Sequence, residues 1–488
     1  MRTSFLLAPI TALFVITSFA LAQQPSYSAE FLGPGSGVTR MNASGVIIGS
    51  DTTTFGGMRG WVAKSGSAPA ALPLPAGRLT SWANDVNDLG VIVGSVSSSS
   101  FSPEFGGVAC AWYPKLGGGY DIVEFGILPG DNRSDALGVN DVGDVVGYSA
   151  DSMFREPVLF TGPSGLQNLS ATGVFDPQKI NDQRVLIDVT GKRLDLDTMV
   201  VENLGHPAGS FSAVNCYDIN ELGQVAASAI STTSTNCNRY VARYSDGIGW
   251  EVFGACGQNN GASEVNDLGD MLTFVTLTHY ARFEGEGTFA LDSLITSPAG
   301  QWSVLTWTGG TAMNDARELA VGAQNLVTGQ VGVVLLTRDA PVGTQICSGD
   351  GSVAACPCGN PSVAGEGCKN SSGHGAKLAA NGSASVAADN LVLRVTQAAA
   401  GKPALFFQGA NSVAVPFQDG ILCAGGSIKR LQAVTLDATG ASQSTASIVT
   451  QGGVVPGVTR VYQAWFRDPQ GPCGTSSNLS SAVQITWQ

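Results

Sequence analysis

Two pairs of closely spaced carboxylates offer the oxygen ligands that Ca²⁺ prefers. Asp131 and Asp135 lie in "GDNRSD", and Asp195 and Asp197 lie in "LDLDT". Ca²⁺ takes about six to eight oxygens from flexible loops, but neither stretch has the spacing of an EF-hand loop. Polar turn residues on exposed strand faces are the simpler interpretation. We therefore predict no cofactor and no metal site, with Ca²⁺ as the alternative.

Thiolates at close spacing are a second source of metal ligands, because two of them can share a zinc ion. Cys356 and Cys358 are separated only by Pro357. The cysteines divide into an even four before residue 340 and an even six after it, which favours disulfides in an oxidising compartment over zinc. Six cysteines allow about 15 pairings, and the sequence does not choose among them. The disulfide candidates are Cys110, Cys216, Cys237, Cys256, Cys347, Cys356, Cys358, Cys368, Cys423 and Cys473.

General-base catalysis has few candidates, since the chain contains three histidines, His206, His279 and His374. None lies in a G-x-S-x-G elbow or an H-E-x-x-H motif. We therefore predict no catalytic residue and regard an enzyme as the less favoured class. Aromatic side chains either line a sugar-binding groove or pack between strands, and packing is favoured. They are Trp82, Trp112, Trp250, Trp302 and Trp307.

The first 22 residues have the layout of an export signal. Arg2 gives the positive start, residues 5–20 are almost wholly apolar, and residues 20–22, "ALA", form a small-x-small cleavage site. No other stretch approaches the roughly 18 apolar residues that span a bilayer. We expect a mature chain from about Gln23 that is secreted, extracellular or associated with the cell surface, and not membrane-embedded.

Charge separates two parts of the chain. Residues 341–488 hold 8 Lys/Arg and 6 Asp/Glu, a net charge of +2, and the remaining 17 and 32 give residues 1–340 a net charge of −15. An acidic body repels phosphate backbones, so nucleic acid is excluded as a partner. An extracellular protein or a glycan is the expected partner class, and the oligomeric state is left open.

Seven near-copies of one turn run through the first part of the chain, such as "GVNDVGDVVGYS" at 138–149. Their asparagines are spaced by 45, 53, 41, 39, 46 and 48 residues, which is the period of a four-stranded propeller blade. Asparagine opens a type I turn, and glycine three residues later supplies positive φ. The predicted turn residues are Asn42, Asn87, Asn140, Asn181, Asn220, Asn266 and Asn314 with Gly45, Gly90, Gly143, Gly223 and Gly269.

Two copies lack that glycine. Arg184 and Arg317 occupy its position, where a residue with Cβ in the left-handed region costs about 1 kcal/mol. The sequence leaves two explanations: these turns differ in type, or the fold tolerates the strain.

The repeats predict an all-β fold, with a seven-bladed β-propeller over residues 23–340. Two further strand-like segments follow each hairpin, but the seventh copy has no fourth strand before Pro341. Residues 27–33, "YSAEFLG", have the character of that missing strand. Pairing them into the last blade closes the ring and removes exposed edges. An open β-solenoid is the less favoured alternative.

The pattern "ALGVNDVGDVVGYS…PVLFTG…LQNLS" resembles the HAF family of extracellular repeat proteins, over about residues 27–339. The resemblance implies a secreted, propeller-like array and no established enzymatic activity.

Residues 341–488 differ in composition from the repeats before them. "ICSGDGSVAACPCGNPSVAGEGCKNSSGHG" is rich in cysteine and poor in apolar residues, so it needs cross-links. Strand-like runs follow, and we predict a small disulfide-stapled β-sandwich with Cys423 and Cys473 on loops. This part resembles a C-terminal domain at the end of many predicted secreted bacterial proteins, which by analogy implies adhesion, sorting or surface association.

The predicted function is therefore a secreted, non-enzymatic protein that presents a binding surface at the cell exterior. The alternative is an exported propeller hydrolase or lyase acting on polysaccharide through channel carboxylates. Inward-facing Asp or Glu with a general-acid partner would favour the enzyme, and a channel lined by amide, hydroxyl and glycine backbone would favour binding.

Overall fold

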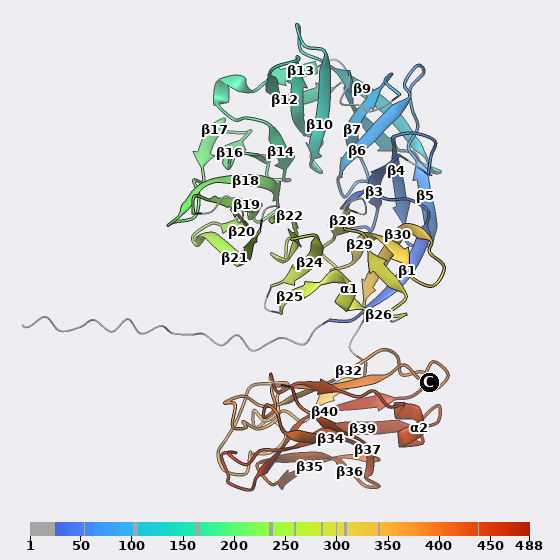
Figure 1. The fold of residues 1–488 in the computed structure, drawn as a ribbon, viewed down its shortest axis with the longest axis vertical. Coiled ribbons are helices and arrows are strands. Elements are labelled where there is room, and N and C mark those ends of the chain that lie inside the picture. The colour runs from blue at the N-terminus through green and yellow to red at the C-terminus, as the bar shows by residue number, and fades with distance from the viewer. Residues whose placement is uncertain are drawn as a thin grey trace, which may run out of the picture. The chain divides into compact units, whose positions relative to one another are not determined.

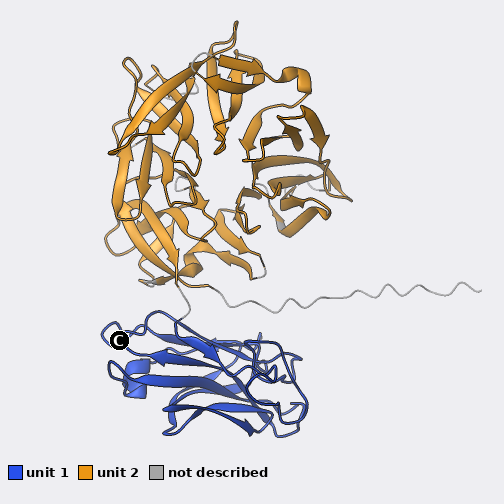
Figure 2. Ribbon diagram, turned by 180° about the vertical axis from the view of Figure 1, so that it is seen from behind, with its two compact units in different colours: residues 1–23, 341–488 blue, residues 24–340 orange. Residues whose placement is uncertain are grey.

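The computed structural model describes residues 25–488 except 53, 101–105, 163–164, 234–237, 258–259, 285, 299, 307–309, 340–341 and 438. The predicted signal peptide, Cys237 and Trp307 therefore lie outside the described residues. The chain divides into two compact units. We call Gln24–Ala340 the N-terminal unit and Pro341–Gln488 the C-terminal unit (Figure 2). The regular elements of both units are almost all strands, so the all-β prediction is confirmed.

The N-terminal unit contains seven sheets among its described residues, arranged around a common centre (Figure 1). Six of them are four-stranded, with strands in sequence order and antiparallel neighbours. Their strands are β2(Val38–Met41), β3(Ile47–Asp51), β4(Arg59–Lys64), β5(Ser67–Ala71); β6(Thr80–Val86), β7(Ile92–Ser97), β8(Val108–Pro114), β9(Tyr120–Gly126); β10(Arg133–Val139), β11(Val145–Ala150), β12(Arg155–Gly162), β13(Gly165–Asn168); β14(Pro177–Ile180), β15(Val185–Asp188), β16(Lys192–Asp195), β17(Val200–Asn203); β18(Phe211–Ile219), β19(Val225–Ser231), β20(Arg239–Ser245), β21(Gly249–Gly257); and β22(Gly261–Val265), β23(Met271–Val275), β24(Thr278–Phe283), β25(Gly287–Ala290). A 3₁₀ turn, Ser170–Thr172, follows β13.

The seventh sheet combines the two ends of this unit. Its later strands are β26(Ile295–Ser297), β27(Trp302–Val304), β28(Thr311–Met313), β29(Leu319–Asn325) and β30(Val331–Arg338), and a short helix α1(Leu291–Leu294) precedes them. Strand β1(Tyr27–Gly33) pairs antiparallel with β30, so that Tyr27 lies opposite Arg338. It also pairs in parallel with β26. The start of the unit is thus hydrogen-bonded to its end.

Each Asn-containing turn joins two consecutive antiparallel strands: the first two in the four-stranded sheets, and β28 and β29 in the seventh sheet. In the third copy, the Asn140 N–H donates to the Asp144 carbonyl oxygen and the Gly143 N–H donates to the Asn140 carbonyl oxygen. Gly143 has a φ of 96°, in the region that glycine adopts without strain. Arg184 and Arg317 adopt the same turn with φ values of 63° and 62°. These two copies therefore keep the turn type and accept the strain.

Apolar side chains fill the space between neighbouring sheets. One cluster joins Ile48 on β3 to Val96 and Trp112 on the next sheet, and all three are fully buried. The Trp112 indole N–H donates to the Pro73 carbonyl oxygen at 2.9 Å. Trp302 stacks on Phe31 across the strand pairs of the seventh sheet. Neighbouring sheets thus bury apolar surface against one another, as stacked repeats do.

The C-terminal unit has two sheets that share one core. The five-stranded sheet follows the order β31-β40-β39-β34-β37, and a three-stranded sheet follows the order β32-β33-β38. Their bounds are β31(Thr344–Ile346), β32(Lys377–Asn381), β33(Val392–Thr396), β34(Pro403–Gly409), β37(Lys429–Thr435), β38(Ser442–Gln443), β39(Thr459–Arg467) and β40(Ser477–Thr486); a hairpin of β35(Asn411–Phe417) and β36(Gly420–Gly425) and a helix α2(Ile448–Gly452) complete the unit. Leu393 on β33 packs with Phe406 on β34 and Phe466 on β39.

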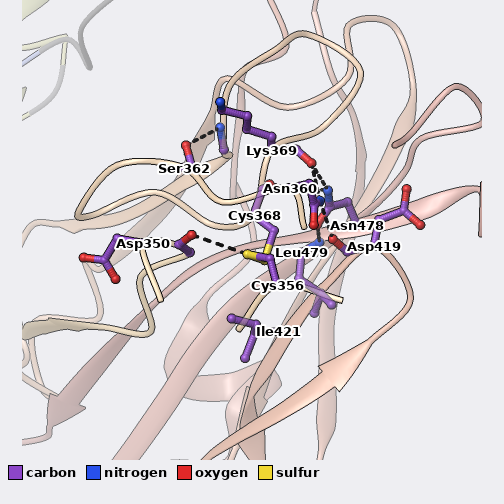
Figure 3. Close-up of a disulfide and its surroundings, with 12 residues drawn as sticks. Asp350, Cys356, Asn360, Ser362, Cys368, Lys369, Asp419, Ile421, Asn478 and Leu479 are labelled. Atoms are coloured by element: carbon purple, nitrogen blue, oxygen red, sulfur yellow. Dashed lines mark hydrogen bonds between the residues drawn. A yellow bond between two sulfur atoms is a disulfide. The ribbon is translucent and has the colours of Figure 1, made fainter. Parts of the chain in front are cut away.

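Three disulfides hold the cysteine-rich segment: Cys347–Cys423, Cys356–Cys368 and Cys358–Cys473. Cys356 and Cys358 have different partners, so the zinc alternative is wrong. Cys423 lies within β36, so its predicted loop position is also wrong. Beside the Cys356–Cys368 bond, the Asn360 amide donates to the Lys369 and Asp419 carbonyl oxygens (Figure 3). Four of these six cysteines are buried in one cluster with apolar side chains such as Ile421, so sulfur supplies part of the core.

The cysteines of the N-terminal unit behave differently. Cys256 is disulfide-bonded, but Cys110 and Cys216 are buried free thiols. The disulfide prediction is therefore wrong for these two. Each of them lies on a strand, β8 or β18, inside a separate apolar cluster, where it packs as a small hydrophobic residue. Burial raises the pKa of both thiols, well above the ordinary value for Cys110.

Candidate binding site at the common centre of the seven sheets

In every sheet of the N-terminal unit, the strand that precedes the asparagine turn ends at one cavity of about 130 Å³, whose lining includes residues from all seven turns. These strands are β2, β6, β10, β14, β18, β22 and β28. Six of them change register with their partner strand two to four residues before the asparagine, as between Ala83 and Asp85 on β6. Such bulges re-aim side chains. In five of the seven sheets, the residue two positions before the asparagine is charged and lines the cavity. These residues are Arg40, Asp85, Lys179, Asp218 and Glu264.

The seven asparagines connect neighbouring sheets through their side-chain amides. In each, Oδ1 accepts the backbone N–H four residues later, which holds the turn. Nδ2 of each of the first six donates to the backbone carbonyl oxygen of the next asparagine. The N···O distances are 2.8 Å for Asn42 to Asn87, 2.9 Å for Asn87 to Asn140, 2.9 Å for Asn140 to Asn181, 3.1 Å for Asn181 to Asn220, 2.7 Å for Asn220 to Asn266 and 3.2 Å for Asn266 to Asn314. We call this chain of contacts the asparagine ladder.

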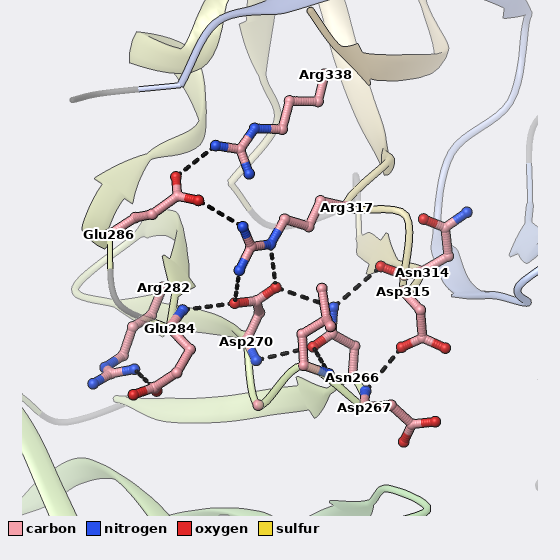
Figure 4. A network of polar contacts seen from close by, with 12 residues as sticks. Asn266, Asp267, Asp270, Arg282, Glu284, Glu286, Asn314, Asp315, Arg317 and Arg338 are labelled. Atoms are coloured by element: carbon pink, nitrogen blue, oxygen red, sulfur yellow. Dashed lines mark hydrogen bonds and ion pairs between the residues drawn. The ribbon is translucent and has the colours of Figure 1, made fainter. Parts of the chain in front are cut away.

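The residue after each asparagine forms a second set of links. In six copies it is acidic, and its carboxylate accepts the backbone N–H of the equivalent residue in the preceding sheet. Asp315, for example, accepts from the Asp267 N–H at 2.8 Å, next to the Asn266 amide (Figure 4). We call these six residues the carboxylate ring: Asp88, Asp141, Asp182, Glu221, Asp267 and Asp315. All six line the cavity, and none is fully buried.

Beneath the asparagines, five charged side chains meet across the centre. The Arg40 guanidinium lies 2.8 Å from Asp218 and 3.2 Å from Glu264, although these residues belong to the first, fifth and sixth sheets. The Lys179 ammonium lies 2.9 Å from Asp85 and donates to the Leu137 carbonyl oxygen. We call Arg40, Asp85, Lys179, Asp218 and Glu264 the charged cluster.

Each carboxylate of the charged cluster also accepts a backbone N–H from the following sheet. The donors are Val139 for Asp85, Val265 for Asp218 and Met313 for Glu264. Burial, with Asp218 nearby, raises the pKa of Glu264 to about 8 despite the opposing effect of Arg40. Burial likewise lowers the pKa of the Lys179 ammonium, which Asp85 partly offsets.

The two strained arginines of the turns connect neighbouring sheets as well. Arg184 forms an ion pair with Asp144, at 2.7 Å, and another with Asp197. Arg317 lies 2.7 Å from Asp270 and 2.6 Å from Glu286, which also pairs with Arg338 (Figure 4). A glycine could not make these contacts, so the ion pairs offset the cost of the left-handed backbone.

The carboxylates first considered as Ca²⁺ ligands do not assemble a site. Asp195 accepts the backbone N–H groups of Asp197 and Thr198, as a turn residue does, and the Thr198 contact leads in lowering its pKa. Asp135 accepts from the Asn84 amide at 2.9 Å. Within the described residues, no group of three or more His, Cys, Asp or Glu could hold a metal ion.

The histidines and tryptophans also lie away from the cavity. His206 contacts the Pro207 carbonyl oxygen, and His279 lies against Phe274, where burial lowers its pKa. Neither these two nor His374 lines the cavity. Trp250 donates its indole N–H to the Leu204 carbonyl oxygen and contacts Tyr244 edge to face. These positions fit packing rather than a sugar-binding groove.

Neither the charged cluster nor the contacts that the asparagine amides make between sheets were predicted from the sequence, where the acidic residues after the asparagines were interpreted as independent turn residues. One signal was available: the position two before each asparagine reads Arg, Asp, Gly, Lys, Asp, Glu, Ala along the seven copies. Charged residues at five equivalent positions inside otherwise apolar strands indicate a shared polar interior.

The fold described above follows from the strand pairing of this chain and not from a match to a known protein. No family model and no curated protein matches the chain. A solved structure described as a gluconolactonase is similar with a TM-score of 0.31 and 11% identity, over 64% of this chain and 94% of that chain. The SapL1 lectin in complex with alpha methyl fucoside gives 0.30 and 13%, over 62% and 90%. GH43B of the Bacteroides ovatus xyloglucan PUL gives 0.21 and 11%, over 96% and 91%.

A search of the described residues for helices found none that is long and apolar enough to cross a membrane.

Proposed function

We propose that the chain is an exported, non-enzymatic binding protein. Its N-terminal unit is a seven-bladed β-propeller of the HAF type, closed by β1, and its C-terminal unit is a β-sandwich that associates with the cell surface. The pairing of β1 with β30 supports the closed ring. The asparagine ladder supports the common centre of the seven sheets, and it ends at Asn314, whose amide donates to Glu318. Three disulfides in the C-terminal unit fit an oxidising exterior.

The charged cluster is the observation that carries the non-enzymatic assignment. Catalytic carboxylates of a glycosidase must reach a sugar, but Asp85, Asp218 and Glu264 are 0–4% exposed. Each also accepts a backbone N–H and pairs with Arg40 or Lys179. The cavity of about 130 Å³ admits one side chain or a few waters, since a cavity of about 150 Å³ holds a single benzene. A polysaccharide strand does not fit.

One observation favours the alternative, an exported hydrolase or lyase. Glu264, whose pKa burial raises to about 8, lies with Asp218 around Arg40, and two carboxyl groups in such different surroundings could act as an acid and base pair. This second candidate requires the centre to open to a substrate.

Two measurements on the full exported chain test the proposal. N-terminal sequencing of protein recovered from medium and cell surface should give a mature chain starting near Gln23, and removal of residues 341–488 should shift it from the surface to the medium. A panel of polysaccharides should show no new reducing ends or unsaturated products. Cleavage that Glu264→Gln abolishes would establish the enzyme instead, and retention of the uncleaved chain inside the cell would reject export.

A further inference from the structure

The mouth of the central cavity carries exposed apolar side chains beside the carboxylate ring. The second residue after the asparagine is Leu89, Val142, Leu222 or Leu268 in four of the seven turns. Their exposed fractions are 64%, 62%, 64% and 49%. Each follows a member of the carboxylate ring in its turn, so these side chains flank the cavity without lining it, and Leu222 also borders a second cavity between the fourth and fifth sheets. We call these four exposed apolar side chains the collar.

The carboxylate ring inside this collar has no cationic partner. No Lys or Arg of the described chain forms an ion pair with any of its six members. Each carboxylate uses oxygen to accept a neighbour's backbone N–H, and the carboxylates remain close enough to repel one another. Burial and then Asp182, Asp267 and Asp141 raise the pKa of Glu221 to about 7, and the pKa values of Asp88 and Asp267 are raised for the same two reasons.

A second observation that indicates a ligand is an unpaired carboxylate oxygen of Asp218, which lines the cavity. Asp218 is fully buried and lines the cavity, and its Oδ1 has no hydrogen-bond partner, whereas Oδ2 contacts Arg40 and the Val265 N–H. An unpaired buried carboxylate oxygen is costly. A donor entering through the ring would satisfy it.

Resting on the proposed function, we propose that this mouth docks a partner protein through a loop that presents one lysine or arginine side chain between apolar residues. The cationic head enters the carboxylate ring and points toward Asp218, and the flanking residues cover the collar of Leu89, Val142, Leu222 and Leu268. Charge complementarity selects a cation, and the volume of about 130 Å³ limits it to a single side chain. The collar is aliphatic, whereas sugars stack on aromatic rings, so the surface fits a polypeptide.

The test uses fluorescence anisotropy with the full mature chain and a labelled, disulfide-cyclised hairpin peptide that has Leu-Lys-Leu at its tip. Matched peptides carry Leu-Gln-Leu or Ser-Lys-Ser. We expect saturable binding of the first peptide that weakens about tenfold or more without the cation or without the leucines, and that weakens as salt is raised.

Variants of the chain place the effect at the mouth. Asp141→Asn combined with Asp182→Asn keeps the oxygens that accept the backbone N–H groups and removes two charges, so binding should fall about tenfold while the chain stays folded. Leu89→Ser combined with Leu222→Ser should do the same through the collar. Asp121→Asn is the matched control, because this exposed carboxylate pairs with Lys115 away from the mouth.

Equal binding of the Lys and Gln peptides, or no saturation up to about 1 mM peptide, would overturn the docking proposal. Binding of Ca²⁺ alone that blocks the peptide and is lost in the Asp variants would overturn it too, in favour of a metal site. In either case, a mature chain that starts near Gln23, is recovered at the cell surface and cleaves no polysaccharide leaves the proposed function standing, so the two proposals fail separately.

Discussion

The two units of this chain are held together by different contacts: hydrogen bonds between sheets in the N-terminal unit, and disulfides in the C-terminal unit. The N-terminal unit connects its sheets by buried amide contacts that recur at every turn, from Asn42 to Asn314. The C-terminal unit connects its loops by three disulfides that close 12, 76 and 115 residues of sequence. A repeat can reuse one polar contact because each copy presents the same donor and acceptor. A segment without repeats and with few apolar residues needs covalent links.

The largest expected effect comes from the longest disulfide. Changing Cys358 and Cys473 together to serine should lower the unfolding free energy of the C-terminal unit by about 2–5 kcal/mol, because the unfolded chain regains the freedom of a long loop. Calorimetry of the full chain should show one transition moving to lower temperature and the transition of the N-terminal unit staying in place. If both transitions moved together, the two units would not be independently stabilised.

The next effect should come from one rung of the asparagine ladder. Asn87→Asp keeps the Oδ1 that accepts the Val91 N–H but replaces the donor to the Asn140 carbonyl oxygen with a carboxylate oxygen, so that this buried carbonyl keeps only the Gly143 N–H and faces a negative charge. We expect a loss of about 1–3 kcal/mol in denaturant unfolding of the N-terminal unit. Asn203→Asp is the control, since exposed Asn203 uses only its Oδ1, toward the Gly205 N–H. Equal losses of unfolding free energy in the two variants would show that the amide contact between neighbouring turns does not stabilise the unit.

The charged cluster should make the N-terminal unit sensitive to pH. The pKa of Glu264 rises from 4.5 unfolded to about 8 folded, so the folded state holds the extra proton. Its contribution to stability is complete below pH 4.5 and is lost as the pH rises toward 8, with a slope of at most about 1.4 kcal/mol per pH unit for one proton. Arg40, Lys179 and Asp218 face the same carboxyl group.

Glu264→Gln should flatten the stability of the N-terminal unit between pH 4.5 and 8, measured by urea unfolding at several pH values. Glu202→Gln, which changes an exposed carboxylate, should leave the slope intact. An unchanged slope in Glu264→Gln would show that Glu264 is ionised in the folded protein. The transition of the C-terminal unit, which lacks this group, is an internal reference.

The smallest effect concerns the strained turns. Arg184→Gly removes the cost of a positive φ, about 1 kcal/mol, and also the ion pair with Asp144, so the net change should be within about 1 kcal/mol. Arg184→Ala keeps the strain and loses the ion pair. We expect the Gly variant to be more stable than the Ala variant by about 1 kcal/mol in thermal unfolding. The reverse order would mean that Arg184 carries no strain.

Local features of the chain were predictable because they depend on neighbouring residues. The hairpin around Asn140 and Gly143 follows from their conformational preferences, and the alternation of apolar residues around it predicts strands. The all-β class and the four-stranded sheets are confirmed on that basis. The free state of Cys110 and Cys216 was not predictable, because an even count of cysteines says nothing about which of them approach one another.

The sequence by itself determined the turns, the strands, the period of about 45 residues and the change in texture at Pro341. Only the tertiary structure decided that Arg40 meets Asp218 and Glu264 across a shared centre, and which cysteines are bonded. The physical reason is the distance along the chain over which each kind of interaction acts. Turn and strand preferences act over a few residues, whereas a charge contact between the first and fifth sheets, or a disulfide across 115 residues, exists only after the intervening elements have packed.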